Sequence, residues 1–366
     1  MEKEDKDKRG NMNPFKYGSV VTGKFFTDRE EELQQVKMKL DSENHLVLIS
    51  PRRFGKSSLV EMALQDIPRD HILIDMQYVI DVDDLAAHIV KSILNLHTWE
   101  KIKHLMSHFR VAPTLTTNAL TGSIEVSFQP TVSSAALLED AMALIDKVST
   151  SENRLIVVFD EFQEILNIGK GLDKQLRSLM QRQKNLNYIL MGSQESMMED
   201  IFEKKASPFY HFGYVLHLHK IPREKFEEYL DERLPDVAEK VEIIQEILDF
   251  TRCHPYYTQL LASEVWEKIM YSHIHENVVN VAKESIVSAR DLDFERLWLA
   301  QNRTDRSLLL QIAKEHETIK SKLQPKSTRY SALRKLQKAG LLIKVENFEL
   351  EDPFFRVWML KTIETK

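Results

Sequence analysis

The chain has 366 residues, of which 43% are hydrophobic and 29% are charged, with a single cysteine, Cys253. This composition is ordinary for a globular protein, and the length predicts two or three domains. One cysteine excludes an internal disulfide and a multi-cysteine metal site, and it is typical of a reducing compartment, so we expect a cytoplasmic protein. The charged run at 1–12 predicts a disordered tail, and no stretch approaches the ~18 apolar residues that a membrane helix needs.

The formal net charge of −6 is spread unevenly along the chain. Residues 301–366 hold 14 Lys and Arg against 8 Asp and Glu, a balance of +6, so the rest of the chain carries −12. A basic C-terminal segment on an acidic body suggests that an anionic partner would bind that segment alone.

The first predicted strand, 45–50, runs into a loop and then a predicted helix over 56–65. The loop fits the phosphate-loop pattern G-x-x-x-x-G-K-[ST], except that Ser50 replaces the first glycine. Backbone N–H groups of such a loop point at phosphate oxygens, and the positive end of the helix dipole faces the same anion. Lys56 would reach the β- and γ-phosphates, and the Ser57 hydroxyl would bind Mg²⁺. The pattern therefore predicts a nucleotide-binding protein.

A second strand, 71–77, and two helices, 83–94 and 135–148, follow in the same alternating rhythm. The segment 109–130 interrupts it, because it is rich in Thr, Ser and Val and contains two prolines and a T-G-S turn at 121–123. We predict an inserted β-hairpin here, with 111–116 paired to 123–128.

An acidic pair follows the next predicted strand, in which Leu155–Phe159 form an uninterrupted apolar run. The carboxyl ends of parallel strands line the crevice where open α/β sheets bind ligands. Asp160 would hold Mg²⁺ directly or through water, and Glu161 would orient the attacking water or accept its proton.

A helix over 172–183 and strands over 188–192 and 214–218 complete the alternation, which predicts a doubly wound parallel sheet. Ser193 would face the γ-phosphate; the alternative is that it caps a helix that begins near Glu195, and both roles can coexist. Two arginines of the helix, Arg177 and Arg182, are candidates for a transition-state arginine that acts on a neighbouring subunit; the alternative is a solvated basic face.

After residue 221 the pattern is helical, with predicted helices over 222–230, 238–250, 255–271, 278–289 and 291–300. A second group has helices at 305–315, near 318–323 and at 327–340, followed by two short strands within 341–350 around a turn at Asn347. Three helices and a two-stranded wing predict a winged helix. Helix 327–339 could bind DNA through its basic residues Arg329, Arg334, Lys335 and Lys338, or the winged helix could pack on the preceding helices.

Several motifs together resemble the STAND-like archaeal and bacterial ATPases, a branch of the AAA+ P-loop NTPases, over roughly residues 13–360. The segments N-P-F at 13–15 and F-T-D-R-E-E-E-L at 26–33 are similar to that family's adenine-pocket motif. The remaining similar segments are P-R-R-F-G-K-S-S at 51–58, F-D-E-F-Q at 159–163, M-G-S at 191–193 (sensor 1) and C-H-P-Y-Y at 253–257 (the lid motif G-x-P). Two departures stand out, since Ser50 and Cys253 replace glycines of the family patterns.

The resemblance implies a P-loop ATPase core at 13–221 with the hairpin insert, an α-helical lid at 222–300 and a winged helix at 301–366. It implies ATP or ADP as the ligand with Mg²⁺ held by Ser57 and Asp160, and a protein partner or self-association. The residues it implies as catalytic are Lys56, Asp160, Glu161 and Ser193. The residues it implies as nucleotide-binding are Arg29, Pro51, Arg52, Arg53, Phe54, Gly55, Lys56, Ser57, Ser58 and Pro255.

Some of these residues have other interpretations from the sequence. Arg29 could belong to a helix-start ion pattern with Glu30, Arg52 and Arg53 could pair with acids, and His254 could be a packed histidine. Three functions remain open: a slow ATP-dependent molecular switch, a DNA-binding ATPase that uses the winged helix, and a nucleotide-binding scaffold without turnover. Glu161 argues against the scaffold, because a catalytic carboxylate has no use there.

Overall fold

The computed structural model describes residues 12–26, 28–97, 99–106, 109–110, 113–117, 124–128, 133–315, 326–344 and 347–363. These residues form two compact units. The sheet unit comprises Glu30–Ser50 and Leu59–Leu218. The helical unit comprises the described residues of Met1–Arg29, Pro51–Ser58 and His219–Lys366, so it includes the phosphate loop.

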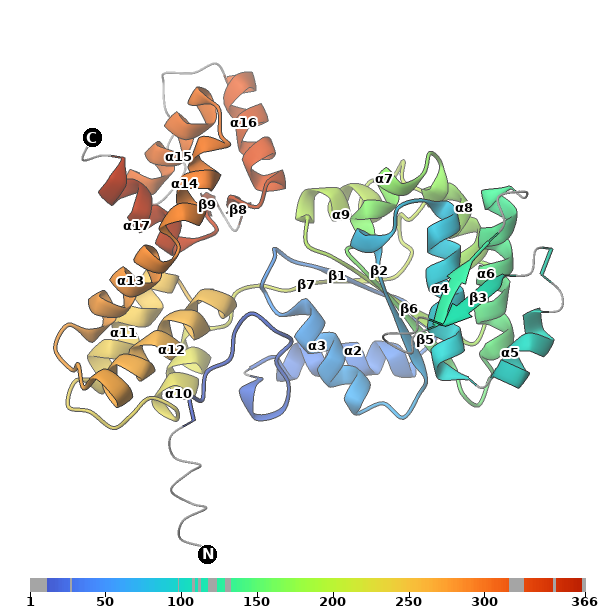
Figure 1. Ribbon diagram of the computed structural model, residues 1–366, viewed down its shortest axis with the longest axis horizontal. Coiled ribbons are helices and arrows are strands. Elements are labelled where there is room, and N and C mark those ends of the chain that lie inside the picture. The colour runs from blue at the N-terminus through green and yellow to red at the C-terminus, as the bar shows by residue number, and fades with distance from the viewer. Residues whose placement is uncertain are drawn as a thin grey trace, which may run out of the picture. The chain divides into compact units, whose positions relative to one another are not determined.

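The sheet unit is built on five parallel strands in the order β2-β5-β6-β1-β7 (Figure 1). Their bounds are β1 Leu46–Ile49, β2 His71–Asp75, β5 Leu155–Asp160, β6 Leu186–Gly192 and β7 Tyr214–His217. Every residue of β1 and β6 is buried, which means that both faces of the sheet are covered, because successive side chains point to opposite faces. The prediction of a doubly wound parallel sheet is confirmed, and all five predicted strands are present.

Helices cover this sheet, and two of them begin with a side-chain cap. They are α2 Glu30–Asp41, α3 Lys56–Gln65, α4 Val82–Leu96, α6 Ser134–Val148, α7 Ile165–Ile168, α8 Leu172–Met180 and α9 Glu195–Phe202. Asp81 caps α4 and Ser133 caps α6 by accepting hydrogen bonds from N–H groups of the first turn, which fixes where these helices start. The boundary between the two units passes through α3, whose first three residues belong to the helical unit.

The predicted inserted hairpin is present as β3 Thr114–Thr117 and β4 Ile124–Ser127, paired antiparallel with Thr114 opposite Ser127. Its predicted turn at 121–123 lies outside the described residues. Partly buried Leu115, Ile124 and Val126 pack against the core of the sheet unit, so the hairpin contributes apolar side chains to it. The helix α5, Trp99–Met106, precedes the hairpin in the chain, and the sequence analysis did not predict it.

The helical unit has one continuous hydrophobic core. The short 3-10 helix η1 spans Gly23–Phe25, and the first group of helices is α10 Arg223–Asp231, α11 Lys240–Thr251, α12 Pro255–Ser272, α13 Val278–Ala289 and α14 Asp291–Leu299. The C-terminal part contains α15 Arg303–Glu315, α16 Lys326–Lys338, the antiparallel strands β8 Leu342–Lys344 and β9 Phe348–Leu350, and α17 Pro353–Thr362 (Figure 1). The predicted short helix near 318–323 lies outside the described residues, as does most of the predicted tail.

The sequence analysis missed α17, although its start carries a recognisable signal. Asp352 accepts hydrogen bonds from the backbone N–H groups of Phe354 and Phe355, and Pro353 occupies the first helical position. Within the described part of the chain, no helix is both long and apolar enough to span a membrane.

Candidate functional site

The acidic pair lies at the carboxyl edge of the sheet unit, as predicted from its place after an apolar run. Asp160 is the last residue of β5, and the neighbouring strand β6 ends at Gly192, which is paired with Ile49 of β1. The ends of these three parallel strands therefore meet at one edge. Glu161 adopts a left-handed backbone conformation with φ of 49°, which is uncommon for a residue with a side chain and turns the chain sharply after the strand.

The Glu161 carboxylate is held in place by a small hydrogen-bond network. Its Oε2 accepts hydrogen bonds from Gln163 Nε2 at 2.6 Å, from the Ser193 hydroxyl at 2.7 Å and from the Ser193 backbone N–H at 3.3 Å. Ser193 thus contacts the carboxylate, and the alternative that it caps α9 is wrong, because Gln194 occupies the N-cap position. The network fixes one orientation of a carboxylate that could position water.

Gly192 allows this network to form. A Cβ atom at this position would lie 2.4 Å from Gln163 Oε1 and 2.3 Å from Met198 Sδ, so any larger residue must displace these side chains. Gln163 is a site residue that the sequence analysis did not single out, although it lies in the quoted segment F-D-E-F-Q.

The predicted Mg²⁺ ligands offer the right chemistry. Asp160 is partly exposed, and its Oδ1 accepts a hydrogen bond from the Glu161 N–H at 2.9 Å. Ser57, also partly exposed, lies in the first turn of α3. No group of three or more His, Cys, Asp or Glu residues within the described ranges could by itself enclose a metal. Mg²⁺ does not require one, because it binds through one or two protein oxygens with phosphate and water.

The phosphate loop belongs to the helical unit and is held there by hydrogen bonds. Lys56 is only 6% exposed, and its ammonium donates a hydrogen bond to the Pro51 carbonyl at 3.1 Å. Gly55 has φ of 91°, a conformation for which glycine is the natural residue. The Ser58 hydroxyl accepts a hydrogen bond from the Val21 N–H at 2.9 Å.

Arg29 supports the same loop. It is 4% exposed, and its guanidinium donates to the carbonyls of Phe54 at 3.3 Å and His219 at 2.6 Å. The helix α2 does begin at Glu30, as the alternative interpretation supposed, but the Arg29 side chain is directed to these two carbonyls. Phe54 is buried, and its ring meets the His254 ring edge-on at 4.8 Å.

Both loop arginines are exposed. The Arg53 guanidinium nevertheless has defined partners: it lies 4.6 Å from the centre of the Tyr256 ring and donates to the Tyr257 hydroxyl at 2.9 Å. Arg53 also comes within 3.8 Å of the Glu351 carboxylate. Its acidic partner is thus a buried group, not a surface acid.

The segment C-H-P-Y-Y forms the start of α12, with Pro255 as its first residue. His254 is 2% exposed, and its Nδ1 accepts a hydrogen bond from the Tyr256 N–H at 3.3 Å, so it is a packed, capping histidine. Burial lowers the pKa of His254 well below its ordinary value, so the ring is neutral and its 3.8 Å approach to Glu351 is not an ion pair.

The two departures from glycine have different structural settings. Cys253 has φ of 57°, in the left-handed region that glycine adopts readily, so its side chain is accommodated at some cost in strain. Ser50 is fully buried and is not among the residues with positive φ, so the backbone there does not require glycine.

Arg177 and Arg182 lie on or just after α8. The Arg177 guanidinium lies 5.0 Å from the centre of the Phe212 ring, and Phe212 stacks on His45 at the opposite, amino-terminal edge of the sheet. Arg182 is exposed, with a 3.5 Å contact to the Ser178 hydroxyl. Neither arginine lies at the edge that carries Asp160.

The order of the strands defines the class of protein. β6 lies between β1, which leads into the phosphate loop, and β5, which ends in the acidic pair. With a helical region after the sheet, this is the architecture of an AAA+ P-loop ATPase. The chain belongs to the family of ATPase domains found predominantly in Archaea, whose family model matches residues 26–259.

Solved structures share this fold at low sequence identity. The chain is similar to the Walker-type ATPase of Pyrococcus abyssi, with a TM-score of 0.65, 20% identity and coverage of 94% of this chain and 99% of that one. It is also similar to the ORC2 protein of Aeropyrum pernix in ADPNP and ADP complexes, with a TM-score of 0.57, 15% identity and coverage of 96% and 98%. The ORC1 protein of Aeropyrum pernix in complex with DNA gives a TM-score of 0.51 at 11% identity, with 94% of each chain covered. No curated protein matches the sequence.

Proposed function

We propose that this ATPase is a molecular switch of the STAND type, which binds ATP with Mg²⁺, hydrolyses it slowly and changes the arrangement of its lid and C-terminal region with nucleotide state. The proposed parts are a core at 13–221, a lid at 222–300 and a winged helix at 301–366. The observation that carries the switch is that the phosphate loop packs within the helical unit, where Arg29 holds the loop and Phe54 contacts His254.

Each site residue has a role in this proposal. Lys56 would bind the β- and γ-phosphates, and Pro51 to Ser58 would surround them with backbone N–H groups. Ser57 and Asp160 would hold Mg²⁺, which neutralises the phosphate charge. Glu161, oriented by Ser193 and Gln163, would position the attacking water or take its proton.

The nucleotide itself would set the state of the switch. ATP offers a γ-phosphate to Lys56 and to the Ser193 region, whereas ADP does not, and such a loss of contacts releases segments that the phosphate had ordered. Arg29 and Pro255 would line the adenine side of the site, and Arg52 is exposed and able to reach an anion.

The deciding experiment is titration calorimetry with ATP and ADP in the presence of Mg²⁺. Lys56→Ala should abolish tight binding, because a charge-assisted contact to phosphate is lost. Lys91→Ala, a partly exposed lysine within α4 of the sheet unit, is the control and should bind like the wild type. Unchanged ATP affinity in Lys56→Ala would refute the assignment of the loop.

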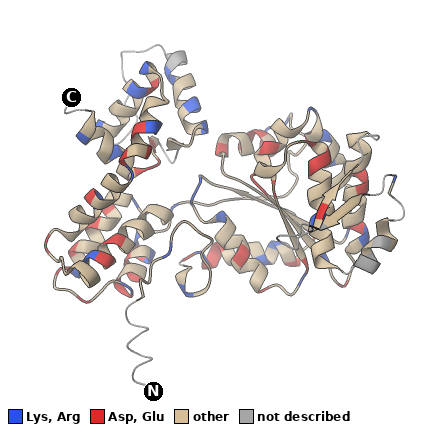
Figure 2. Cartoon of the chain, in the orientation of Figure 1, with Lys and Arg blue, Asp and Glu red and all other residues tan. Residues whose placement is uncertain are grey.

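A second candidate is a DNA-binding ATPase, favoured by the +6 balance of residues 301–366. Figure 2 shows Lys and Arg along the C-terminal helices, interspersed with Asp and Glu. On α16, Arg334 and Lys338 are exposed, but Lys335 forms an ion pair at 2.5 Å with Asp305, which is buried. Because part of the basic charge is used inside the unit and the body is acidic, we favour the switch without DNA.

A further inference from the structure

Arg53 has an unusual backbone and an unusual set of contacts for a residue of a phosphate loop. Its φ is 64°, in the left-handed region where a side chain is disfavoured, so the surrounding contacts must hold it there. Those contacts come from the start of α12: the Tyr256 ring beneath the guanidinium and the Tyr257 hydroxyl that accepts its hydrogen bond. Phe54, the next residue, packs against His254 of the same segment.

Glu351, in the C-terminal part of the helical unit, also contacts these residues. It follows β9, and its backbone N–H donates to the Leu341 carbonyl at 3.1 Å, which closes the β8–β9 hairpin. The residue is 9% exposed, and its Oε2 accepts a hydrogen bond from the Tyr257 hydroxyl at 2.6 Å. Its Oε1 lies 3.8 Å from both Arg53 and His254 and has no hydrogen-bond partner among the described residues.

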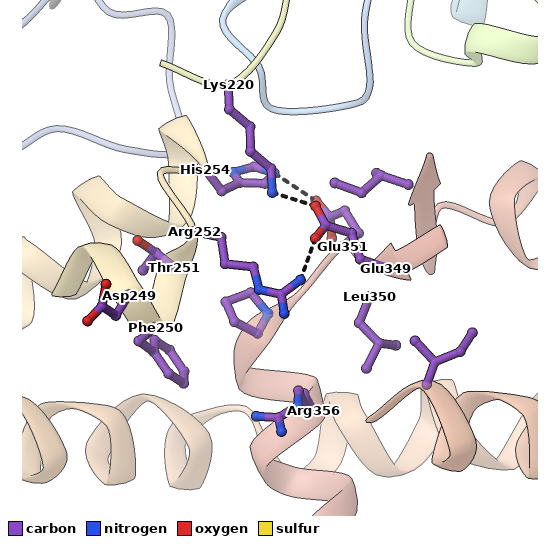
Figure 3. A pocket seen from close by; sticks show the side chains of 13 residues that line it. Lys220, Asp249, Phe250, Thr251, Arg252, His254, Glu349, Leu350, Glu351 and Arg356 are labelled. Carbon is purple, nitrogen blue, oxygen red and sulfur yellow. Dashed lines mark hydrogen bonds and ion pairs between the residues drawn. The ribbon is translucent and has the colours of Figure 1, made fainter. Parts of the chain in front are cut away.

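The other cations of this region are engaged elsewhere. Figure 3 shows Lys220 and Arg252 directed at Glu349, with which both form ion pairs, while Glu351 faces His254. Arg290 pairs with Asp352 at 2.9 Å. Since His254 is neutral, Arg53 is the cation within 4 Å of the Glu351 carboxylate in the described part of the chain.

We infer that Arg53 is a positioning residue of the phosphate loop and that Glu351, through Tyr257 and its own charge, holds Arg53 in place. The loop is then preorganised for phosphate by a carboxylate of the C-terminal hairpin, although Glu351 itself touches no nucleotide. Because coupling between two sites is reciprocal, phosphate binding at the loop would also favour the packing of the hairpin against α12. This inference rests on the proposed function, and it assigns to Arg53 a role other than direct phosphate contact.

The two roles of Arg53 predict opposite results for Glu351→Gln. The comparison is made at about pH 8.5, above the raised pKa of Glu351, where its carboxylate is ionised. If Glu351 positions Arg53, the loss of this charge should weaken ATP binding about 5- to 10-fold, the scale of an ordinary coupling between sites. If Arg53 binds phosphate directly, the same substitution frees the guanidinium and should leave the affinity unchanged or raise it.

The test is a double-mutant cycle of Arg53→Gln and Glu351→Gln, with ATP and ADP dissociation constants measured by fluorescence of a labelled nucleotide. We expect each single variant to weaken binding. The double variant should bind no more weakly than Arg53→Gln, because both substitutions remove the same interaction. Glu349→Gln is the matched control: it lies on the same hairpin and is ion-paired, but its partners are Lys220 and Arg252.

Additive effects, an unchanged Glu351→Gln, or an equal loss in Glu349→Gln would overturn the inference. Thermal unfolding of each variant separates a coupling effect from a loss of folding, and Glu351→Gln keeps the size and hydrogen-bonding capacity of the side chain. If wild-type protein binds ATP and Lys56→Ala does not, while the cycle is additive, only the inference fails. If the wild type binds no ATP, the proposed function fails first.

Discussion

Glu161 is the residue on which turnover should depend most. Its carboxylate is oriented by Ser193 and Gln163, and Glu161→Gln preserves the shape of the side chain while removing its ability to accept a proton. We expect turnover to fall by roughly 100-fold or more, the usual scale for the loss of a general base, with ATP affinity retained.

Phosphate release under single-turnover conditions measures this effect, and titration with ATP provides the control on binding. Ser193→Ala should give a smaller loss, because it removes one orienting hydrogen bond but leaves the carboxylate. Wild-type phosphate release by Glu161→Gln would show that another group activates the water.

Glu351 should make the stability of the protein depend on pH. Burial raises the pKa of this carboxyl group from 4.5 to about 7. The folded protein therefore favours the protonated form, and this contribution to stability is fully present below about pH 4.5 and lost as the pH rises through 7. The groups that face it are Tyr257 of α12, its N-cap residue His254, Arg53 of the loop, the adjacent Asp352, and Arg290.

Glu351→Gln cannot ionise, so its free energy of unfolding should lack this pH dependence. Between pH 4.5 and pH 7.5, the free energy of unfolding of the variant should rise by up to about 3 kcal/mol relative to that of the wild type. A pKa shift of one unit corresponds to ~1.4 kcal/mol. Urea unfolding at four pH values in this range measures the difference, with Glu349→Gln as the control. Parallel profiles for wild type and Glu351→Gln would contradict the prediction.

At the scale of elements, the junction between β6 and α9 depends on Gly192. Gly192→Ala places a methyl group against Gln163 and Met198, so these side chains must move. We expect a loss of about 1–3 kcal/mol in the free energy of unfolding, as for other overpacked sites, together with slower turnover, because Gln163 no longer orients Glu161.

Urea unfolding and phosphate release check the two parts of this prediction. Adding Gln163→Ala should recover part of the stability, since it removes one of the two groups that the methyl meets, but it should not recover turnover. A stable and fully active Gly192→Ala would show that the junction has room that the structure does not indicate.

At the scale of the whole molecule, charge decides between the two candidate functions. Residues 1–300 carry −12, which opposes a duplex near the body, against the +6 of residues 301–366. We expect no salt-sensitive binding of a labelled duplex in fluorescence anisotropy at low salt, with ATP or with ADP.

Binding of the duplex, the opposite outcome, can be traced to a surface by charge reversal. If a duplex binds, Arg334→Glu with Lys338→Glu should remove the binding, and Lys170→Glu with Lys184→Glu on exposed sites of the sheet unit should not. Lys335 is left unchanged, because a glutamate there would face the buried Asp305. Loss of binding in the first pair alone would establish the C-terminal segment 301–366 as the DNA-binding surface.

The sequence by itself determined the parallel sheet, the phosphate loop and the acidic strand end, because each depends on local patterns: apolar runs of strand length, G-K-S before a helix, and Asp160–Glu161 directly after a buried strand. It also predicted the inserted hairpin and most helices. It missed α5, α7 and α17, and α17 could have been found from Asp352 and Pro353, a cap followed by a first-turn proline.

Only the tertiary structure decided which partners the site residues have. Ser193 contacts Glu161 and not its own helix, Gln163 joins that network, and Arg53 meets a carboxylate 298 positions further along the chain. Glu351 carries no local signal, because one acid after a short strand is common on any surface. Its importance comes from burial and from the groups around it, and these are set by long-range packing that no spacing in the sequence records.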